Sequence, residues 1–394
     1  GGASGRNGGQ VHSWFAEIDQ LAQLVGDDEA LRLCRATVDA IDELSALQSS
    51  GTIDMDLRLD GWLWTASATA QEGAWDAAVA SGAAKGGTPL RALNADAIRA
   101  CSGTGSSYVG VAEMRAGSLH PAKLALGLRA LAQSRGVVLH EGTPVQQIES
   151  GKLCRLVTPG GVLTAGKVVI AANAWAAAIP ELRRYMYIVD SQIIATAPVP
   201  DRLEALGFTS GAAICDSQAH VLYWQRTPGG RVIFGRGSGN VAFCGAFGPA
   251  FNRRHGQTGD NVRELLRVYP TLRDVAVTHD WTGPIDCTAE HFPVFGHLSG
   301  QPDILFGVGF NGTGIAQTPV AGRILASLVL GRDDVWSRSG LVGLAGRTVL
   351  PPEPIRYLGA RVVRHAIRLR NDAEIQNRSP GPLVRFLSTL VPSR

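Results

Sequence analysis

Residues 303–314 read Asp303-Ile304-Leu305-Phe306-Gly307-Val308-Gly309-Phe310-Asn311-Gly312-Thr313-Gly314 and decide the fold. The short, mostly apolar run 303–306 predicts a buried strand, and the residues from about Ala316 to Leu330 predict a helix. Gly307, Gly309 and Gly312 fit G-x-G-x-x-G, and Asp333 lies where that fingerprint places an acid. Four glycines between a strand and a helix favour a close approach of backbone to a ligand over a tight turn without one.

A complete dinucleotide-binding fold at this end of the chain is excluded. The fingerprint needs a second hydrophobic strand that carries its acid. After Asp333 the chain instead reads Asp334-Val335-Trp336-Ser337-Arg338, and no further βαβ unit follows. The motif therefore indicates one ligand-binding loop at a helix N-terminus.

A second glycine-rich stretch opens the chain as Gly1-Gly2-Ala3-Ser4-Gly5-Arg6-Asn7-Gly8-Gly9, with no strand before it. Leucine, valine and isoleucine then recur at helical spacing between Glu17 and Gln48, with a break at Gly26. A strand is expected at 61–66 and helices near 70–81 and from Asn94. The stretch therefore leads into a largely helical segment.

The segment from 117 to 176 has the order of an α/β nucleotide-binding domain. We expect a helix at 122–134, strands at 137–141 and 145–148, and a hairpin of 153–158 with 161–164 across Pro159-Gly160. The apolar run Lys167–Ala172 is typical of a buried parallel strand. From 183 to 295 the pattern becomes β-rich, with strands at 187–197, 220–226 and 231–235 and a helix at 260–269.

These elements predict an α/β (α+β) protein of two interleaved domains. A Rossmann-like FAD/NAD(P)-binding domain, truncated at its N-terminus, takes residues 1–50, 117–182 and 296–345. An antiparallel β-rich substrate domain takes residues 51–116 and 183–295. Residues 346–394 form a basic helical C-terminal extension.

Composition places the chain among ordinary globular proteins. It has 394 residues, 45% hydrophobic and 18% charged, with a net charge of +3 that implies no general attraction to nucleic acid. Six scattered cysteines without a CxxC pair or metal-ligand spacing favour reduced thiols, a cytoplasmic location and no metal site. No apolar run reaches the roughly 20 residues of a transmembrane helix.

The basic excess is confined to the C-terminal extension. Residues 351–394 carry eight arginines against three acids, hence +5. A basic helix at 356–370 could touch a membrane surface or an acidic partner. We favour a solvated basic face, with the apolar side chains Leu358, Val362, Ile367 and Leu369 packed inward.

Taken together, five segments occur in the order found in FAD-dependent oxidoreductases of the D-amino-acid oxidase and sarcosine oxidase superfamily. They are Gly1–Gly9, Ser118–Pro121, Val168–Trp175, Trp281–Gly296 and Gly307–Gly322. The chain resembles this superfamily over nearly its whole length. Its likeness is greatest to gamma-glutamylputrescine oxidase-like proteins, whose Gly-Ala-Ser-Gly-Arg-Asn-Gly-Gly run matches Gly2–Gly9.

The resemblance implies a non-covalent FAD site. The family's first βαβ unit, which binds the ADP moiety, is expected to be missing before Gly1. Asn173 replaces a glycine of the family's Ala-Gly-Ala-Trp turn. Cys287 is closer to His291 than the cysteine that carries FAD in sarcosine-oxidase-like proteins, so we expect a free thiol. The implied cofactor-binding residues are Ala3, Ser4, Gly5, Arg6, Asn7, Gly8, Gly9, Val145, Ala172, Trp175, Gly307, Gly309, Phe310, Asn311, Gly312, Thr313 and Gly314.

The implied reaction is oxidation of a C–N bond in an amine or amino acid, by hydride transfer to the flavin and hydrolysis of the imine. O2 or another acceptor takes the electrons. Ala316 replaces the lysine of sarcosine oxidases, and none of the four lysines lies between 168 and 394, so oxidase and dehydrogenase both stay open. The candidate substrate residues are Tyr187, Gln192, Tyr223, Arg226 and His291.

Two alternatives come from other classes. The chain could be a truncated or degenerate relative that keeps the fold but neither binds FAD nor catalyses. An FAD-dependent RNA-modifying enzyme of similar fold would need a basic RNA surface, and the only basic cluster is the C-terminal extension. We therefore rank the RNA-modifying enzyme last.

Overall fold

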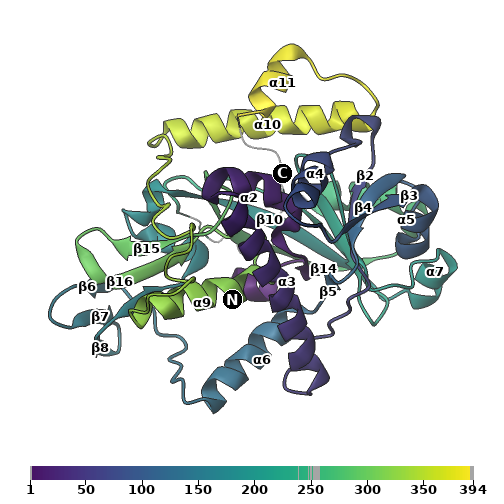
Figure 1. Cartoon of the computed structure of the whole chain (residues 1–394). Coiled ribbons are helices and arrows are strands. Elements are labelled where there is room, and N and C mark those ends of the chain that lie inside the picture. Colours follow the sequence, from purple (N-terminus) through teal and green to yellow (C-terminus); the bar gives the residue numbers. More distant parts are fainter. Residues whose placement is uncertain (1, 238, 247, 249–250, 252–257, 391–394) are drawn as a thin grey trace.

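The computed structural model describes residues 2–237, 239–246, 248, 251 and 258–390, so Gly1 and Arg394 lie outside it. An eight-stranded sheet dominates the molecule, in the order β14-β10-β13-β12-β11-β2-β4-β3 (Figure 1). Neighbouring strands run antiparallel except for the parallel pair β11 and β2. The strands are β2 (Trp62–Ala66), β3 (Leu90–Asn94), β4 (Val109–Glu113), β10 (Met186–Thr196), β11 (Ala213–Asp216), β12 (Leu222–Arg226), β13 (Val232–Arg236) and β14 (Val277–Thr288).

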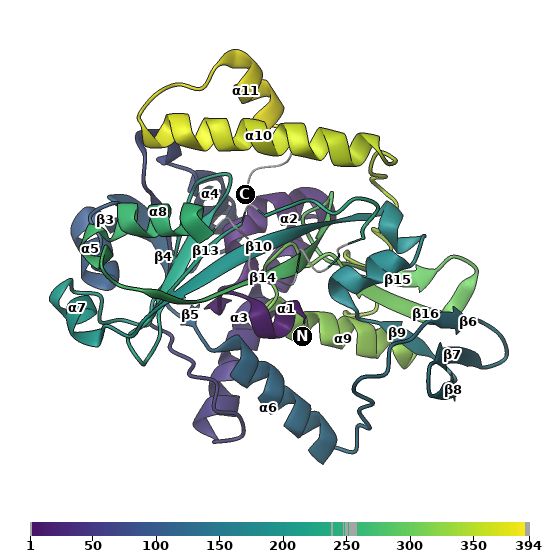
Figure 2. The same cartoon turned by 180° about the vertical axis from the view of Figure 1, so that it is seen from behind.

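The two faces of this sheet have different partners. On one face the alternate residues Leu222 and Trp224 of β12 join a core that includes Phe234 and Tyr269. Short helices contribute to this core, as Figure 2 shows for α8. Tyr223 points to the opposite face, toward the N-terminal glycines. The helices are α5 (Ala95–Ser102), α7 (Pro200–Ala205) and α8 (Thr258–Val268).

A smaller sheet carries the glycine loop that follows residue 308. Its order is β15-β16-β9, from β9 (Val168–Ile170), β15 (Val294–Leu298) and β16 (Gln301–Val308), and β9 runs parallel to β16. The predicted strand, loop and helix are confirmed, since α9 spans Gln317–Val329. The predicted hairpin is confirmed as β7 (Cys154–Thr158) and β8 (Gly161–Ala165), which pair in a meander with β6 (Gln147–Glu149).

The helical N-terminal segment also forms as predicted. Helix α2 (Ile18–Val25) and helix α3 (Asp27–Ser49) meet at Gly26, whose φ of +87° is a conformation that favours glycine. Helix α6 (Pro121–Ser134) confirms the helix expected after His120. The shorter elements are α1 (Ala3–Arg6), β1 (Gln10–Val11), α4 (Asp76–Ala84), β5 (Gly117–Ser118) and the 3₁₀ helices η1 (Trp14–Glu17), η2 (Thr69–Gln71), η3 (Asn173–Ala178), η4 (Leu182–Arg184) and η6 (Pro270–Leu272).

The strand predicted at 137–141 is wrong. These residues form no strand, and Val137, Val138 and Leu139 are exposed. An apolar β-branched run forms a strand only where a neighbour pairs with its backbone, and none does so here.

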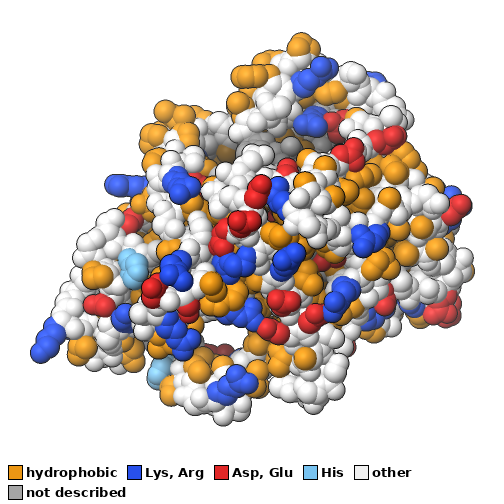
Figure 3. All heavy atoms as spheres, viewed as in Figure 1, with side chains coloured by type: hydrophobic (Ala, Val, Ile, Leu, Met, Phe, Trp, Pro, Cys, Tyr) orange, Lys and Arg blue, Asp and Glu red, His pale blue; other side chains and the backbone are white. Residues whose placement is uncertain are grey.

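The C-terminal extension lies across the body as α10 (Ile355–Ile375) and α11 (Pro382–Ser388) (Figure 1). The prediction of which apolar side chains of α10 point inward is largely wrong. Ile367 is buried, but Leu358, Val362 and Leu369 are exposed. Hydrophobic side chains are visible over this part of the surface in Figure 3. The buried face consists of Val363, Ala366 and Ile367 together with the polar residues Asn371 and Glu374.

All eight strands of the large sheet fall within 51–116 and 183–295, the segments expected for the substrate domain. We keep the two-domain division as a proposal. No helix in the part of the chain that the structure describes has the length and apolar character needed to span a membrane.

Candidate functional site

The carboxylate of Asp286 joins two of the segments predicted to bind a cofactor. Asp286 lies fully buried in β14. One of its oxygens accepts a hydrogen bond from Asn173 Nδ2 at 2.5 Å, and the other accepts one from the Gly309 N–H at 2.6 Å. Its backbone carbonyl accepts from the Asn311 N–H at 2.9 Å. This Asp286 bridge therefore fixes the turn at 171–175 against the loop at 309–314.

Burial raises the pKa of Asp286 from its ordinary 3.8 to about 6, although the N–H groups of Gly309 and Phe310 oppose the rise. The carboxyl is thus mainly ionised at neutral pH, in a place with little solvent to stabilise the charge. The donors on Asn173 and Gly309 stabilise it instead. The protonation state of the carboxyl in this bridge consequently changes near pH 6, just below neutrality.

Loop 309–314 has the backbone shape that its glycines predict. Gly309 has φ +87°, and a Cβ there would lie 2.2 Å from Thr288 Cγ2. Asn311 also has positive φ, and its Oδ1 accepts from the Thr288 N–H at 3.0 Å. Helix α9 then begins without a side-chain cap, so its first N–H groups receive no side-chain acceptor. The loop therefore ends at a helix N-terminus that favours negative charge.

Gly307 differs from the other glycines of this loop. It lies within β16, and a Cβ there would lie 2.9 Å from the ring of Phe295 on β15. Its lack of a side chain therefore serves the packing of β15 against β16. Its predicted role at a cofactor stays a prediction.

The N-terminal glycines lie against the large sheet. A Cβ on Gly8 would lie 2.5 Å from the Tyr223 ring, and the Gly8 carbonyl accepts from Gln225 Nε2 at 2.6 Å. The Asn7 side chain accepts from the Gly9 N–H at 2.8 Å. The Trp281 indole N–H donates to the Arg6 carbonyl at 2.8 Å. These contacts attach the Arg6–Gly9 stretch to β12 and β14.

An open cavity of about 500 Å³ separates the N-terminal run from the turn at 171–175. Arg6 contributes a cation to it, and Trp175 contributes a half-exposed indole. Asn173 Oδ1 is a buried acceptor with no hydrogen-bond partner in the described part of the chain. A ligand with both an anionic and an aromatic part would suit this lining. The residues that line the cavity are Gly2, Ala3, Ser4, Arg6, Ala171, Ala172, Asn173 and Trp175.

The predicted substrate residues do not converge. Tyr223 lies on the face that meets Gly8, and its hydroxyl is 2.6 Å from Ser191 Oγ. Arg226 lies two residues after Trp224 and therefore shares its face of the sheet, opposite to the face of Tyr223. There Arg226 donates to the Thr209 carbonyl at 2.9 Å. Gln192 likewise shares its face of β10 with Ile194, which belongs to the core that includes Phe234. Of these candidates, Tyr223 is the one placed beside a predicted cofactor loop.

The remaining candidates lie at the edges of this region. Tyr187 pairs with Cys287 across β10 and β14, and burial raises the pKa of its phenol well above the usual range. His291 has φ +61° in the turn after β14. Val145 is exposed and precedes β6, which both views place away from α1 (Figures 1 and 2). Their predicted roles stay predictions.

Cys287 is buried, and none of the six cysteines, all of which the structure describes, forms a disulfide. Two of the four lysines are held by acids on the surface: Lys85 pairs with Asp27, and Lys123 pairs with Asp54. Among the described residues, no group of three or more His, Cys, Asp or Glu side chains could hold a metal ion.

Sequence reasoning missed the role of Asp286. The residue lies inside a segment that carries the family resemblance, but nothing local connects it with Asn173 or Gly309. The available signal was a carboxylate in a run of otherwise apolar and small residues, Gly283–Thr288, within a segment that the sequence indicates to be β-rich. A buried carboxylate needs donors, and glycine-loop N–H groups supply them.

Comparison with known proteins gives matches over most of the chain. The family model described as FAD dependent oxidoreductase (DAO) matches residues 1–328. The chain is 28% identical over 333 residues to the gamma-glutamylputrescine oxidoreductase of Escherichia coli K12, and 27% identical over 340 residues to the probable oxidoreductase OrdL of Haemophilus influenzae. Each match covers 84% of this chain and 75% of the relative.

Solved structures give the same fold. The glycine oxidase of Geobacillus kaustophilus superposes with a TM-score of 0.69 at 20% identity, over 88% of this chain and 89% of that one. The L-proline dehydrogenase of P. horikoshii superposes with a TM-score of 0.68 at 17% identity, over 84% of this chain and 85% of that one. At these identities the likeness establishes the fold, a mixed α/β architecture with a large, mainly antiparallel sheet.

Proposed function

Because the chain belongs to the family of FAD-dependent oxidoreductases, we propose that it oxidises a C–N bond of an amine or amino acid. The observation that carries this proposal is the Asp286 bridge, which holds two predicted cofactor segments together. When bound, FAD would accept the hydride that leaves the carbon next to nitrogen, and water would hydrolyse the imine to a carbonyl compound and ammonia, or an amine where the substrate is a secondary amine.

The open cavity beside the N-terminal run supports a non-covalent FAD site. Arg6 offers a cation to a pyrophosphate, and the side-chain oxygen Oδ1 of Asn173 offers an unused acceptor to a donor on the cofactor. Ala3, Ala172 and Trp175, all predicted from the sequence, line the same cavity. The residues present therefore fit a ligand with the charge and aromatic character of FAD.

Loop 309–314 would contribute electrostatics to the reaction. Negative charge grows on a flavin as it accepts a hydride, and an uncapped helix N-terminus stabilises such charge. The N-cap residue of helix α9, Ala316, lies two residues after Gly314 and makes no side-chain cap. The Asp286 bridge fixes the Gly309 end of the same loop, so the stabilising N–H groups need no rearrangement during the reaction.

The substrate would lie on the Tyr223 face of the large sheet, because that face meets Gly8 of the N-terminal run. A matching relative is a gamma-glutamylputrescine oxidoreductase, which supports an amine as the substrate class. The electron acceptor is O2 or another oxidant.

Flavin content and substrate-dependent bleaching test this proposal. The full chain, purified and reconstituted with FAD, should retain yellow flavin absorbance through gel filtration. Anaerobic addition of an amine or amino-acid substrate should bleach that absorbance, and readmitted O2 or an artificial acceptor should restore it. A well-folded chain that stays colourless after reconstitution would refute the proposal and favour a degenerate relative without FAD.

A further inference from the structure

Helices α10 and α11 form an outer layer of the molecule. Both views place α10 across the body, with α11 on the side of α10 that faces away from the large sheet (Figures 1 and 2). The family model ends at residue 328, so both helices lie outside the part of the chain that it matches. The family match therefore gives them no role.

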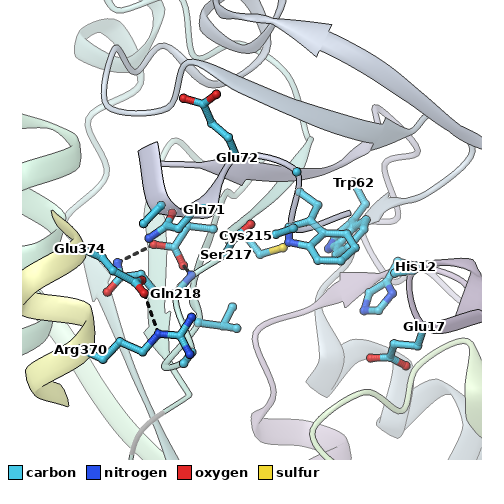
Figure 4. Close-up of a pocket in the computed structure, with 18 residues that line it drawn as sticks. His12, Glu17, Trp62, Gln71, Glu72, Cys215, Ser217, Gln218, Arg370 and Glu374 are labelled. Carbon is cyan, nitrogen blue, oxygen red and sulfur yellow. Dashed lines mark hydrogen bonds and ion pairs between the residues drawn. The ribbon is translucent and has the colours of Figure 1, made fainter. Parts of the chain in front are cut away.

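The inward side of α10 is held against the body. Val363, Ala366 and Ile367 are buried. Further along, Arg370 donates to Glu374 at 2.6 Å, and both line a cavity of about 290 Å³ between the large sheet and α10. Figure 4 shows this pair at one side of that cavity. These contacts fix the rotation of α10 about its axis and so decide which side chains face outward.

The outward side of α10 carries a row of aliphatic side chains. They follow one another at intervals of three, four and seven residues, which is the spacing of one helix face. Each is between 43% and 64% exposed, although the sequence favoured packing three of them inward. Single exposed apolar residues are ordinary, but a continuous row indicates an interaction surface. The row consists of Ile355, Leu358, Val362 and Leu369.

Helix α11 repeats this arrangement. Leu383 and Phe386 lie three residues apart, Leu390 follows four residues later, and all three are more than half exposed. Ser388, on the opposite side of the helix, is buried. Hydrophobic side chains gather over α11 and over one end of α10 at the upper edge of the molecule (Figure 3). The two helices together thus expose seven large apolar side chains.

The charges beside this apolar surface are mostly positive. Asp372 is the one exposed acid within residues 355–390, all of which the structure describes. Four exposed arginines lie in the same range, and of these Arg368 also reaches an acid, Asp260, at 3.5 Å. A second copy of this surface would bring like charges together, which disfavours self-association. The four arginines are Arg361, Arg368, Arg378 and Arg385.

We propose that the outward side of α10 and α11 docks on the surface of an anionic lipid bilayer. The apolar side chains enter the boundary between headgroups and acyl chains, and the arginines bind the lipid phosphates. Both helices then lie in the plane of the membrane and need not span it. This docking requires neither FAD nor turnover, so it is independent of the proposed function.

Co-sedimentation of the full chain with lipid vesicles tests the proposal. Vesicles of phosphatidylcholine alone are compared with vesicles that contain about 30% phosphatidylglycerol, at about 0.1 M salt. We expect at least about tenfold stronger partitioning onto the anionic vesicles, and a marked loss at about 0.5 M salt. Equal partitioning onto both kinds of vesicle would overturn the proposal. Absence of binding to either would overturn it too, and would leave an acidic protein as the occupant of this surface.

Apolar variants locate the docking surface. The double variant Leu358→Gln with Val362→Gln should lower partitioning onto anionic vesicles about tenfold, because two apolar side chains no longer enter the membrane. Phe386→Gln should lower it as well. Val162→Gln with Leu163→Gln is the matched control, because both residues are half-exposed on β8, which both views place away from α10 and α11. An equal loss in this control would refute α10 and α11 as the docking surface.

Basic variants separate the electrostatic contribution. Arg361→Gln with Arg385→Gln should weaken binding to the anionic vesicles severalfold and flatten its dependence on salt, since two phosphate contacts are lost. Arg135→Gln with Lys152→Gln removes the same charge from exposed positions outside the two helices and is the control. If both double variants lose binding equally, net charge and not this surface determines the attraction, and the proposal fails.

The outcomes distinguish this proposal from the proposed function. A chain that retains FAD but stays in the supernatant with anionic vesicles refutes the docking alone. A chain without FAD that still sediments with these vesicles, and no longer does so after Leu358→Gln with Val362→Gln, supports the docking and refutes the oxidoreductase. Circular dichroism melting of each variant confirms that it is folded, as expected for substitutions of exposed side chains.

Discussion

Replacing Asp286 by asparagine should remove a specific pH dependence of stability. Burial raises the pKa of this carboxyl from 3.8 to about 6 in the folded chain. Because the folded pKa lies above the unfolded one, folding favours the protonated form. The stabilising contribution of protonated Asp286 to the free energy of unfolding is therefore fully present below about pH 4, and it is lost as the pH rises through about 6. The gap between the two pKa values corresponds to about 3 kcal/mol.

Urea unfolding at about pH 4.5 and about pH 7 measures this effect. Between these two pH values, acidification should stabilise the wild-type chain by about 2 kcal/mol more than Asp286→Asn. Burial also raises the pKa of Asp216 to about 6, but that group is present in both proteins and cancels in the difference. The exposed Asp96→Asn variant is the control and should keep the wild-type dependence. Parallel curves for wild type and Asp286→Asn would refute the reasoning.

Two further predictions concern the glycine loop and Tyr223. In Gly309→Ala the new Cβ would lie 2.2 Å from Thr288 Cγ2 at a φ of +87°, so we expect a loss of about 2 kcal/mol in urea unfolding and weaker retention of FAD on gel filtration. Gly314→Ala, with its nearest neighbour 3.9 Å away, should keep the wild-type stability, and an equal loss of stability there would contradict the steric argument. Tyr223→Phe loses the 2.6 Å bond to Ser191 and should lower the unfolding free energy by about 1 kcal/mol, with flavin absorbance unchanged because the ring remains. Loss of the flavin in Tyr223→Phe would instead assign the hydroxyl to the cofactor site.

Features set by neighbouring residues were predictable from the sequence. The hairpin at 154–165 needs only two short β-prone runs around Pro159-Gly160, and it forms as expected. The strand at 301–308 is a short apolar run followed by glycines, and that local pattern is enough to place both it and α9. Each of these elements depends on residues close together in the chain.

Features set by distant partners were not predictable. The Asp286 bridge joins residues 113 positions apart at one end and 23 positions apart at the other, and no local pattern relates them. The strand predicted at 137–141 had suitable residues, but the fold provides no neighbouring strand. Gln192 and Arg226 were plausible polar candidates, yet strand alternation turns them away from Tyr223. Which face of a strand meets the site is decided by the packing of the whole sheet.

The inward face of α10 shows why polar residues there carry information. The buried face of α10 carries the apolar side chains Val363, Ala366 and Ile367, as expected of a packed helix, but it also carries the polar residues Asn371 and Glu374. Burying an amide without hydrogen bonds is costly, and neither amide atom of Asn371 has a partner among the described residues. Arg370 and Glu374 satisfy each other and reach the cavity that Gln71 also lines. The apolar residues pack this helix, and the Arg370–Glu374 pair places polar groups at the cavity without leaving either charge unpaired.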